Sequence, residues 1–303
     1  MTNYILGSGL AASIAKIYNP EFLMIGPELK KNMQFGPHYV YKNEDTEDFL
    51  DRLFNFRYLF KFDTKTIWIG YYFDKDFYCI PTPEIITAYK EKTRGKDFKD
   101  DDSIMTNKTH KFDVYDINFN YLMMKMLQTP AIQGEIVKVD LLRKKIYLKV
   151  GEVLSYDKLI STIPAPSFMA ILGLSCEEYK ARDIYFSRLL KDNVEDVYDF
   201  TFDFIYYADP ELDYYRITCN FDKYQNIEYY DVESLDSLST LGYSSQIRKV
   251  EYRRKIYQGQ KLDLTDSRFD DIFFIGRYSR WDNSIRMTEM IQDAKKVSEI
   301  LNG

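Results

Sequence analysis

The stretch Tyr4-Ile5-Leu6-Gly7-Ser8-Gly9-Leu10-Ala11-Ala12 leads from a short apolar run through a glycine-rich turn into an alanine-rich segment. The turn has the spacing GxGxxA. It lies between an expected strand at 3–6 and an expected helix at 10–17, and a second apolar run follows at 22–25. This order of strand, helix and strand is typical of the first unit of a dinucleotide-binding sheet.

The residue types suit the binding of a pyrophosphate. Gly7 makes the tight turn, Gly9 lets a phosphate approach the backbone, and Ala12 allows close packing of the helix on the sheet. The predicted dinucleotide-binding residues of this turn are Gly7, Ser8, Gly9, Leu10, Ala11 and Ala12. The alternative is a glycine-rich turn of an ordinary β-α-β unit. Glu28, shortly after the second run, is either a ribose ligand or a surface charge.

Composition narrows the class of protein. The chain has 303 residues, 45% of them hydrophobic and 29% charged, which predicts a folded protein with a buried core. A net charge of −6 argues against non-specific nucleic-acid binding. We expect neither a signal peptide nor a membrane span, which needs roughly 18 uncharged apolar residues. The aromatic content of 17% indicates either an AT-rich genome or a pocket for a flat ligand.

Cysteine and histidine are scarce. Cys79, Cys176 and Cys219 are far apart, and His38 and His110 are the only histidines. We therefore expect no disulfide framework, no metal site and a cytoplasmic location, in the host cytoplasm if the protein is viral.

Strand-like and helix-like segments alternate along the rest of the chain. Expected strands lie at 66–72, 77–80, 135–139, 145–150, 158–163, 198–207, 214–221 and 271–275, and expected helices at 47–54, 119–128 and 287–301. The charged stretch Lys90 to Lys111 is expected to be a surface loop or flap. The pattern predicts an α/β (α+β) protein with a Rossmann-like domain.

Two later segments resemble the flavin amine oxidase superfamily. Tyr156-Asp157-Lys158-Leu159-Ile160-Ser161-Thr162-Ile163-Pro164 is similar to its "yD.lI.TiP" strand, and Phe273-Phe274-Ile275-Gly276-Arg277, followed by Met287 and a helix, resembles its C-terminal FAD-binding element. The resemblance implies FAD as cofactor. It also implies a discontinuous FAD-binding domain at 1–60, 115–165 and 268–303, with a smaller antiparallel-sheet substrate domain at 61–114 and 166–267.

Three further segments resemble UDP-galactopyranose mutases. They are Phe35-Gly36-Pro37-His38-Tyr39-Val40-Tyr41 with 47–54, Tyr78-Cys79-Ile80-Pro81 and Tyr215-Arg216-Ile217. By this resemblance and by position, the further cofactor residues are Glu28, His38, Val137, Gly276, Arg277, Met287 and Thr288. The candidate catalytic residues are His38, Tyr41 and Arg216, and the candidate substrate residues are Tyr39, Tyr215, Arg216, Trp281 and Arg286.

Several of these residues have plainer interpretations. His38 could hold a loop, and Arg216 could belong to a structural ion pair. Arg280, Trp281 and Arg286 predict either recognition of a phosphate-bearing substrate or a solvated loop. We expect most aromatic residues of 198–230 to be core and sheet surface.

The chain departs from the mutase pattern at the substrate site. Tyr41 replaces a histidine, Ser284-Ile285-Arg286-Met287 replaces "YYDM", a GGN segment is missing, and 90–111 replaces a helical insertion. These departures predict a retained FAD scaffold with a changed substrate.

The first functional hypothesis is an FAD-dependent oxidoreductase or redox-assisted lyase that acts on a C–N bond of a small polar or nucleotide-linked substrate. NAD(P)H is a candidate electron donor. The alternatives are a mutase-type sugar-nucleotide isomerase, an FAD-dependent lyase in viral DNA thymine hypermodification with modified DNA as substrate, and a non-catalytic FAD-binding protein. The sequence leaves the substrate and the oligomeric state open.

Overall fold

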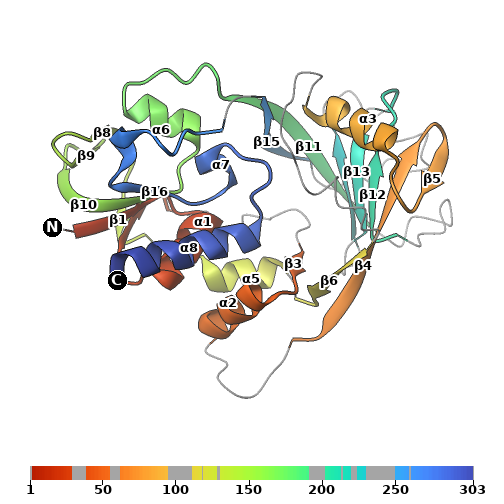
Figure 1. Cartoon of the computed structure of the whole chain (residues 1–303), viewed down its shortest axis with the longest axis horizontal. Helices are drawn as coiled ribbons and strands as arrows, with labels where there is room; N and C mark the ends of the chain where they lie inside the picture. Colours follow the sequence, from red (N-terminus) through yellow and green to blue (C-terminus); the bar gives the residue numbers. More distant parts are fainter. Residues whose placement is uncertain are drawn as a thin grey trace.

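The computed structural model describes residues 2–28, 39–54, 62–94, 111–117, 119–127, 130–190, 202–212, 214–219, 224–229, 250–258 and 261–302. Two sheets organise these residues, and they occupy opposite sides of the molecule in Figure 1. The N-terminal end of α8 (Met287–Asn302) points toward the larger sheet, while the C-terminus lies on the far side. Residues from both sheets can therefore meet at the junction between them.

The smaller sheet has seven strands in the described residues. They are β1 (Thr2–Leu6), β2 (Leu23–Gly26), β7 (Ile132–Gln133), β8 (Ile136–Asp140), β9 (Lys145–Leu148), β10 (Val153–Ser161) and β16 (Ile272–Phe274). Their order is β7-β2-β1-β10-β9-β8, with β16 also paired to β10. The first residues of β10 pair antiparallel with β9, and its last residues run parallel between β1 and β16. The parallel strands β2, β1, β10 and β16 thus end at one edge.

Side-chain alternation along β1 explains the two covered faces of this sheet. Ile5 packs into one core cluster with α1 (Leu10–Tyr18), α8, α2 (Glu44–Phe54) and α5 (Phe119–Met126). Tyr4 and Leu6 point to the other face, where Phe168 of α6 (Ala165–Ile171) packs. A strand with both faces buried has a continuous apolar sequence, as residues 4–6 have.

The larger sheet has nine strands in the described residues. They are β3 (Val40–Tyr41), β4 (Thr64–Phe73), β5 (Asp76–Tyr78), β6 (Lys111–Tyr115), β11 (Lys180–Leu190), β12 (Phe204–Tyr207), β13 (Tyr214–Cys219), β14 (Tyr224–Tyr229) and β15 (Val250–Gln258). The order is β15-β11-β14-β13-β12-β4-β6-β3, with β5 paired to β4. Helix α3 (Pro83–Arg94) packs Ile85 and Tyr89 against this sheet. A 3-10 turn (Ser267–Phe269) and α7 (Arg277–Arg280) flank β16.

The fold class predicted from the sequence is confirmed, since strands and helices combine in a mixed α/β architecture. The prediction of a loop over 90–111 is wrong at both ends. Lys90 to Arg94 form the last turn of α3, and Lys111 begins β6. The Lys92 ammonium donates to the carbonyls of Tyr207 (3.1 Å) and Asp209 (2.6 Å), so tertiary contacts hold this charged stretch in a helix. Residues 95–110 lie outside the described residues, and the domain boundaries stay a prediction.

Candidate functional site

The turn after β1 depends on glycine at position 7. Gly7 has φ +118°, and its N–H donates to the carbonyl of Ile25 on β2 (2.8 Å). A Cβ at this position would overlap the Thr162 hydroxyl, which itself donates to the carbonyl of Leu6. Only a glycine lets the turn lie this close to the end of β10. Thr162 belongs to the segment that carries the flavin amine oxidase resemblance.

A second glycine brings the C-terminal segment to the same edge of the sheet. Gly276, after β16, has φ +112°, and a Cβ there would lie 2.9 Å from the Ala11 Cβ on α1. We call the surface formed by Gly7, Gly9 and Gly276 at the start of α1 the glycine cradle.

Gly9 leaves room for a ligand. It is exposed, and a Cβ built on it would meet no atom of the described residues within 4 Å. Gly9 is also the N-cap of α1, whose first turn has neither a side-chain cap nor an acidic residue. The free N–H groups and the positive end of the helix dipole therefore face open space, which is the arrangement that binds a phosphate. The residues at the cradle fit the pyrophosphate of a dinucleotide such as FAD.

The other predicted cofactor residues differ in burial. Ser8 and Ala12 are buried, Leu10 and Ala11 are half-buried, and Met287 is buried in the core beside α1. Glu28 is exposed two residues after β2, and Val137 is 46% exposed on β8. Their contacts with ribose and adenine stay predictions.

A cluster of positive charge lies where the two sheets meet. Arg216 of β13, Arg277 of α7 and Arg286, just before α8, all lie close enough to the Tyr41 phenol to interact electrostatically. We call these four residues the arginine cluster. Burial lowers the pKa of Arg277, and the like charges of Arg216 and Arg286 lower it further. The Arg277 Nε also donates to the carbonyl of Ile285 (2.9 Å), which fixes this side chain.

Aromatic residues surround the cluster. The Tyr41 ring lies 4.7 Å from the ring of Phe112, and the Arg286 guanidinium carbon lies 5.4 Å from the Tyr41 ring centroid. Tyr206 is the cross-strand partner of Arg216 and stacks on Tyr71 (5.6 Å). Burial raises the pKa of Tyr41 and of Tyr206, so both phenols stay protonated at neutral pH. Sequence reasoning missed Tyr206, Tyr71 and Phe112, because strand register brings them here.

Two predicted substrate residues are buried. Tyr215 has no exposed surface and packs in the core cluster that includes Tyr71, Tyr206 and Ile85. Trp281 is 4% exposed and packs against Ala165, Ile256 and Tyr179. The predicted contacts of both residues with a substrate stay predictions.

Three further residues complete the comparison with the sequence predictions. Tyr39 is half-buried and makes an edge contact with Phe112 (5.9 Å). Arg280 pairs with Asp293 (2.8 Å), which assigns it a structural contact. His38 lies outside the described residues, so its predicted role stays untested.

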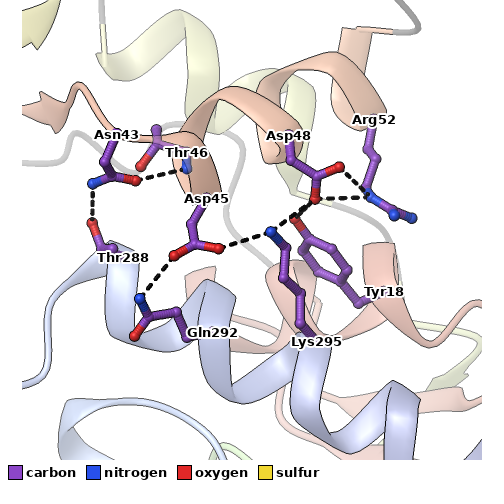
Figure 2. A network of polar contacts seen from close by, with 9 residues as sticks. All are labelled: Tyr18, Asn43, Asp45, Thr46, Asp48, Arg52, Thr288, Gln292 and Lys295. Atoms are coloured by element: carbon purple, nitrogen blue, oxygen red, sulfur yellow. Dashed lines mark hydrogen bonds and ion pairs between the residues drawn. The ribbon is translucent and has the colours of Figure 1, made fainter.

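A polar network joins the segment that follows Tyr41 to the start of α8, and Figure 2 shows its contacts. Asn43, two residues after Tyr41, accepts from the N–H of Thr46 (2.9 Å) and donates to Thr288 (3.1 Å), two residues after Arg286. The start of α2 is thereby tied to the start of α8. The hydroxyl of Thr288, a predicted cofactor residue, is engaged in this contact.

Lys295 extends the same network along α8 (Figure 2). Its ammonium contacts Asp45 (2.8 Å) and Asp48 (3.1 Å), and Tyr18 of α1 donates to Asp48 (3.0 Å). A cleft of about 520 Å³ opens beside these residues, and its charged groups serve mainly to join α1, α2 and α8.

Comparisons with known proteins find similarity in structure. No protein-family model and no curated protein matches the sequence. The structure is similar to reduced UDP-galactopyranose mutase, with a TM-score of 0.69 and 11% identity over 99% of this chain and 95% of that one. It is also similar to p-nitrophenol 4-monooxygenase from Pseudomonas putida, with a TM-score of 0.60 and 9% identity over 99% of this chain and 80% of that one. A putrescine oxidase variant is similar as well, with a TM-score of 0.57 and 9% identity over 99% of this chain and 98% of that one.

The chain has the fold of FAD-binding oxidoreductases. In this fold the glycine cradle and the arginine cluster lie on elements that come together at one junction. In the described residues, no helix has the length and apolar character needed to cross a membrane. Nor do three His, Cys, Asp or Glu side chains gather there in a metal-binding arrangement.

Proposed function

We propose that this protein binds FAD at the glycine cradle and is an oxidoreductase or redox-assisted lyase that acts on a C–N bond of a small polar or nucleotide-linked substrate. The observation that carries the proposal is the open space at Gly9 beside the uncapped N-terminus of α1. The shared fold with the mutase, the monooxygenase and the putrescine oxidase supports it.

The backbone of the chain would hold the cofactor. The first N–H groups of α1 would bind the pyrophosphate, and Gly9 would allow it to approach. Arg277, anchored on Ile285, would add a fixed positive charge to the same edge. Glu28, Val137, Met287 and Thr288 complete the proposed cofactor site. FAD would supply a two-electron acceptor, and the chain would supply orientation and exclusion of water.

The side chains at the junction would bind the substrate. Arg216 and Arg286 present positive charge beside the phenol of Tyr41, which stays protonated because burial raises its pKa. A protonated phenol can donate a hydrogen bond to a substrate atom but cannot accept a proton as a base. We therefore assign Tyr41 to orientation of the substrate. His38 remains the proposed acid or base.

Substitution of Gly9 by alanine tests the cofactor site. The position has φ −81° and open surroundings, so Gly9→Ala should leave the melting temperature of the FAD-free protein unchanged. The added methyl group would occupy the space needed by the pyrophosphate, and FAD should bind roughly 10- to 100-fold more weakly. Flavin absorbance and isothermal titration measure both. Equal affinity of the variant and the unsubstituted protein, or no FAD binding by either, would contradict the proposal.

A mutase-type reaction is the second candidate, favoured by the TM-score of 0.69 with UDP-galactopyranose mutase across nearly both chains. It would isomerise a sugar nucleotide without net oxidation. Dithionite-reduced protein should then interconvert the ring forms of a nucleotide sugar, whereas an oxidoreductase should consume an electron acceptor. The same assay with NAD(P)H tests the candidate electron donor. Release of a modified nucleoside from DNA would instead favour the DNA-modification alternative.

A further inference from the structure

Arg286 has hydrogen-bonding capacity that the described residues do not use. Its guanidinium group lies over the Tyr41 ring, which restrains the side chain by a cation–π contact. The Nε atom is buried, yet it has no hydrogen-bond partner among the described residues. A buried N–H of a charged group without a partner is costly, and a bound ion, water or ligand would remove this cost.

The surroundings of Arg286 add positive charge. Arg216 and Arg277 lie within electrostatic range of it and of Tyr41. The N-terminus of the 16-residue helix α8 begins at the next residue, and its dipole adds to the positive potential.

Two acidic side chains that act electrostatically on the arginine cluster have other partners. Glu289 accepts the backbone N–H of Arg286 (2.8 Å), which caps the start of α8. Asp282 pairs with Lys261 (3.0 Å) and accepts from Ser284 (2.6 Å). Neither contact neutralises the guanidinium group of Arg286. A ligand of negative charge would complete the hydrogen bonds and balance the local charge.

The FAD pyrophosphate has its own binding surface. The glycine cradle offers the open N-terminus of α1 for it, with Arg277 on the connected segment. Arg216 lies on β13 of the larger sheet, whereas the cradle follows β1 and β16 of the smaller sheet. An anion bound at Arg286 would therefore be a second anion beside the pyrophosphate.

We propose that the substrate carries an oxyanion, a carboxylate or a phosphate, that binds between Arg286 and Arg216 against the ring of Tyr41. The inference rests on the proposed function, because the anion belongs to the substrate of the flavin reaction. The planar guanidinium of Arg286 would bind two oxygens of the anion in parallel, and Tyr41 would hold its plane in place. Of the predicted residues Arg280, Trp281 and Arg286, the proposal places Arg286 at the anion.

Binding of two simple anions tests the proposal. Inorganic phosphate and oxalate are titrated separately into FAD-loaded protein, and heat and the flavin spectrum are recorded. At least one anion should bind, and Arg286→Gln should weaken its binding about 10- to 100-fold while the FAD content stays unchanged. Tighter binding of phosphate would indicate a phosphate-bearing substrate, and tighter binding of oxalate a substrate with a carboxylate. Arg268→Gln is the matched control, because Arg268 is exposed before β16, at the opposite end of that strand.

Other results of these titrations would overturn the anion site or the proposed function separately. Equal anion binding by Arg286→Gln and the unsubstituted protein, or no binding by either, would overturn the proposal. Loss of FAD together with loss of anion binding in Arg286→Gln would show that this arginine serves the FAD pyrophosphate, which overturns the inference and keeps the proposed function. If the unsubstituted protein binds no FAD, the proposed function fails. The anion titration on that FAD-free protein, with the same variants, still decides the anion site.

Discussion

The glycine cradle and the arginine cluster lie at neighbouring places in the fold but are built in opposite ways. The cradle consists of backbone, and its shape follows from the absence of a Cβ at Gly7, Gly9 and Gly276. The cluster consists of side chains from β3, β13, α7 and the start of α8, which are separated by up to 245 positions between Tyr41 and Arg286.

The difference separates a binding surface for a common group from one that selects a substrate. A backbone surface binds through N–H groups, which nearly every residue has. Such a surface therefore binds a ligand only where small residues let the ligand reach these groups. A side-chain cluster can change its charge by single substitutions without a change of fold, since function depends on the site and not on the fold. The cradle should therefore be sensitive to added volume, and the cluster to changed charge.

The largest expected effect comes from Gly7→Ala. The substitution forces a non-glycine residue to φ +118° and drives its Cβ into the Thr162 hydroxyl. We expect the free energy of unfolding to fall by about 3 kcal/mol, from backbone strain and overpacking together. Urea denaturation followed by circular dichroism measures it. In a Thr162→Ala background the steric part disappears, so Gly7→Ala should cost less there. An equal cost in both backgrounds would contradict the close packing of the two residues.

The cradle illustrates what the sequence could predict. The apolar run before Gly7, the spacing to Ala12 and the apolar periodicity of 287–301 are local patterns, and β1, α1, β2 and α8 follow them closely. The flavin amine oxidase resemblance around Thr162 added a residue that touches Gly7. These features are short-range in sequence or are determined by backbone sterics, so the sequence alone contains them.

The cluster illustrates what the sequence could not predict. Nothing in the local sequence shows that Tyr215 packs in a core cluster with Ile85 and Tyr89 of α3, while its neighbour Arg216 lies near Tyr41. The pairing of Arg216 with Tyr206 depends on the register of β12 and β13. Long-range contacts likewise hold Lys92 in α3, where local charge indicated a loop.

Lys295→Met should have the second largest effect, because it loosens the network that holds α2 against α8. Hydrogen bonds from Lys295 and Gln292 hold the pKa of Asp45 below its ordinary value. Burial raises the pKa of Asp48, but hydrogen bonds from Lys295 and Tyr18 outweigh burial and lower it. Without the ammonium group, Asp45 loses its ion pair, and Asp48 keeps the pair with Arg52 (3.2 Å). We expect a loss of about 1 kcal/mol in the free energy of unfolding at neutral pH.

The pH dependence of this loss has a defined sign. Because the pKa values of Asp45 and Asp48 are lowered by folding, their contribution is complete above the unfolded value of about 3.9 and is lost as the pH falls through the folded values. Chemical denaturation at several pH values should show the difference between Lys295→Met and the unsubstituted protein shrinking toward low pH. Lys149→Met is the control, since the Lys149–Glu135 pair is exposed on both sides. A difference that is constant with pH would contradict the ionic origin of the effect.

Tyr41→Phe should have the smallest effect. It removes the hydroxyl and keeps the ring, so it distinguishes their contributions to anion binding. The ring supports Arg286 by stacking, and burial raises the pKa of the phenol, so ionisation contributes nothing near neutral pH. Tyr41→Phe should therefore change oxalate affinity by no more than about threefold from about pH 6 to about pH 9, whereas Tyr41→Leu, which removes the cation–π contact, should weaken it further. Titration calorimetry compares the two. A large loss in Tyr41→Phe alone would show that the hydroxyl binds the anion directly, and the cluster would then select its substrate by hydrogen bonding as well as by charge.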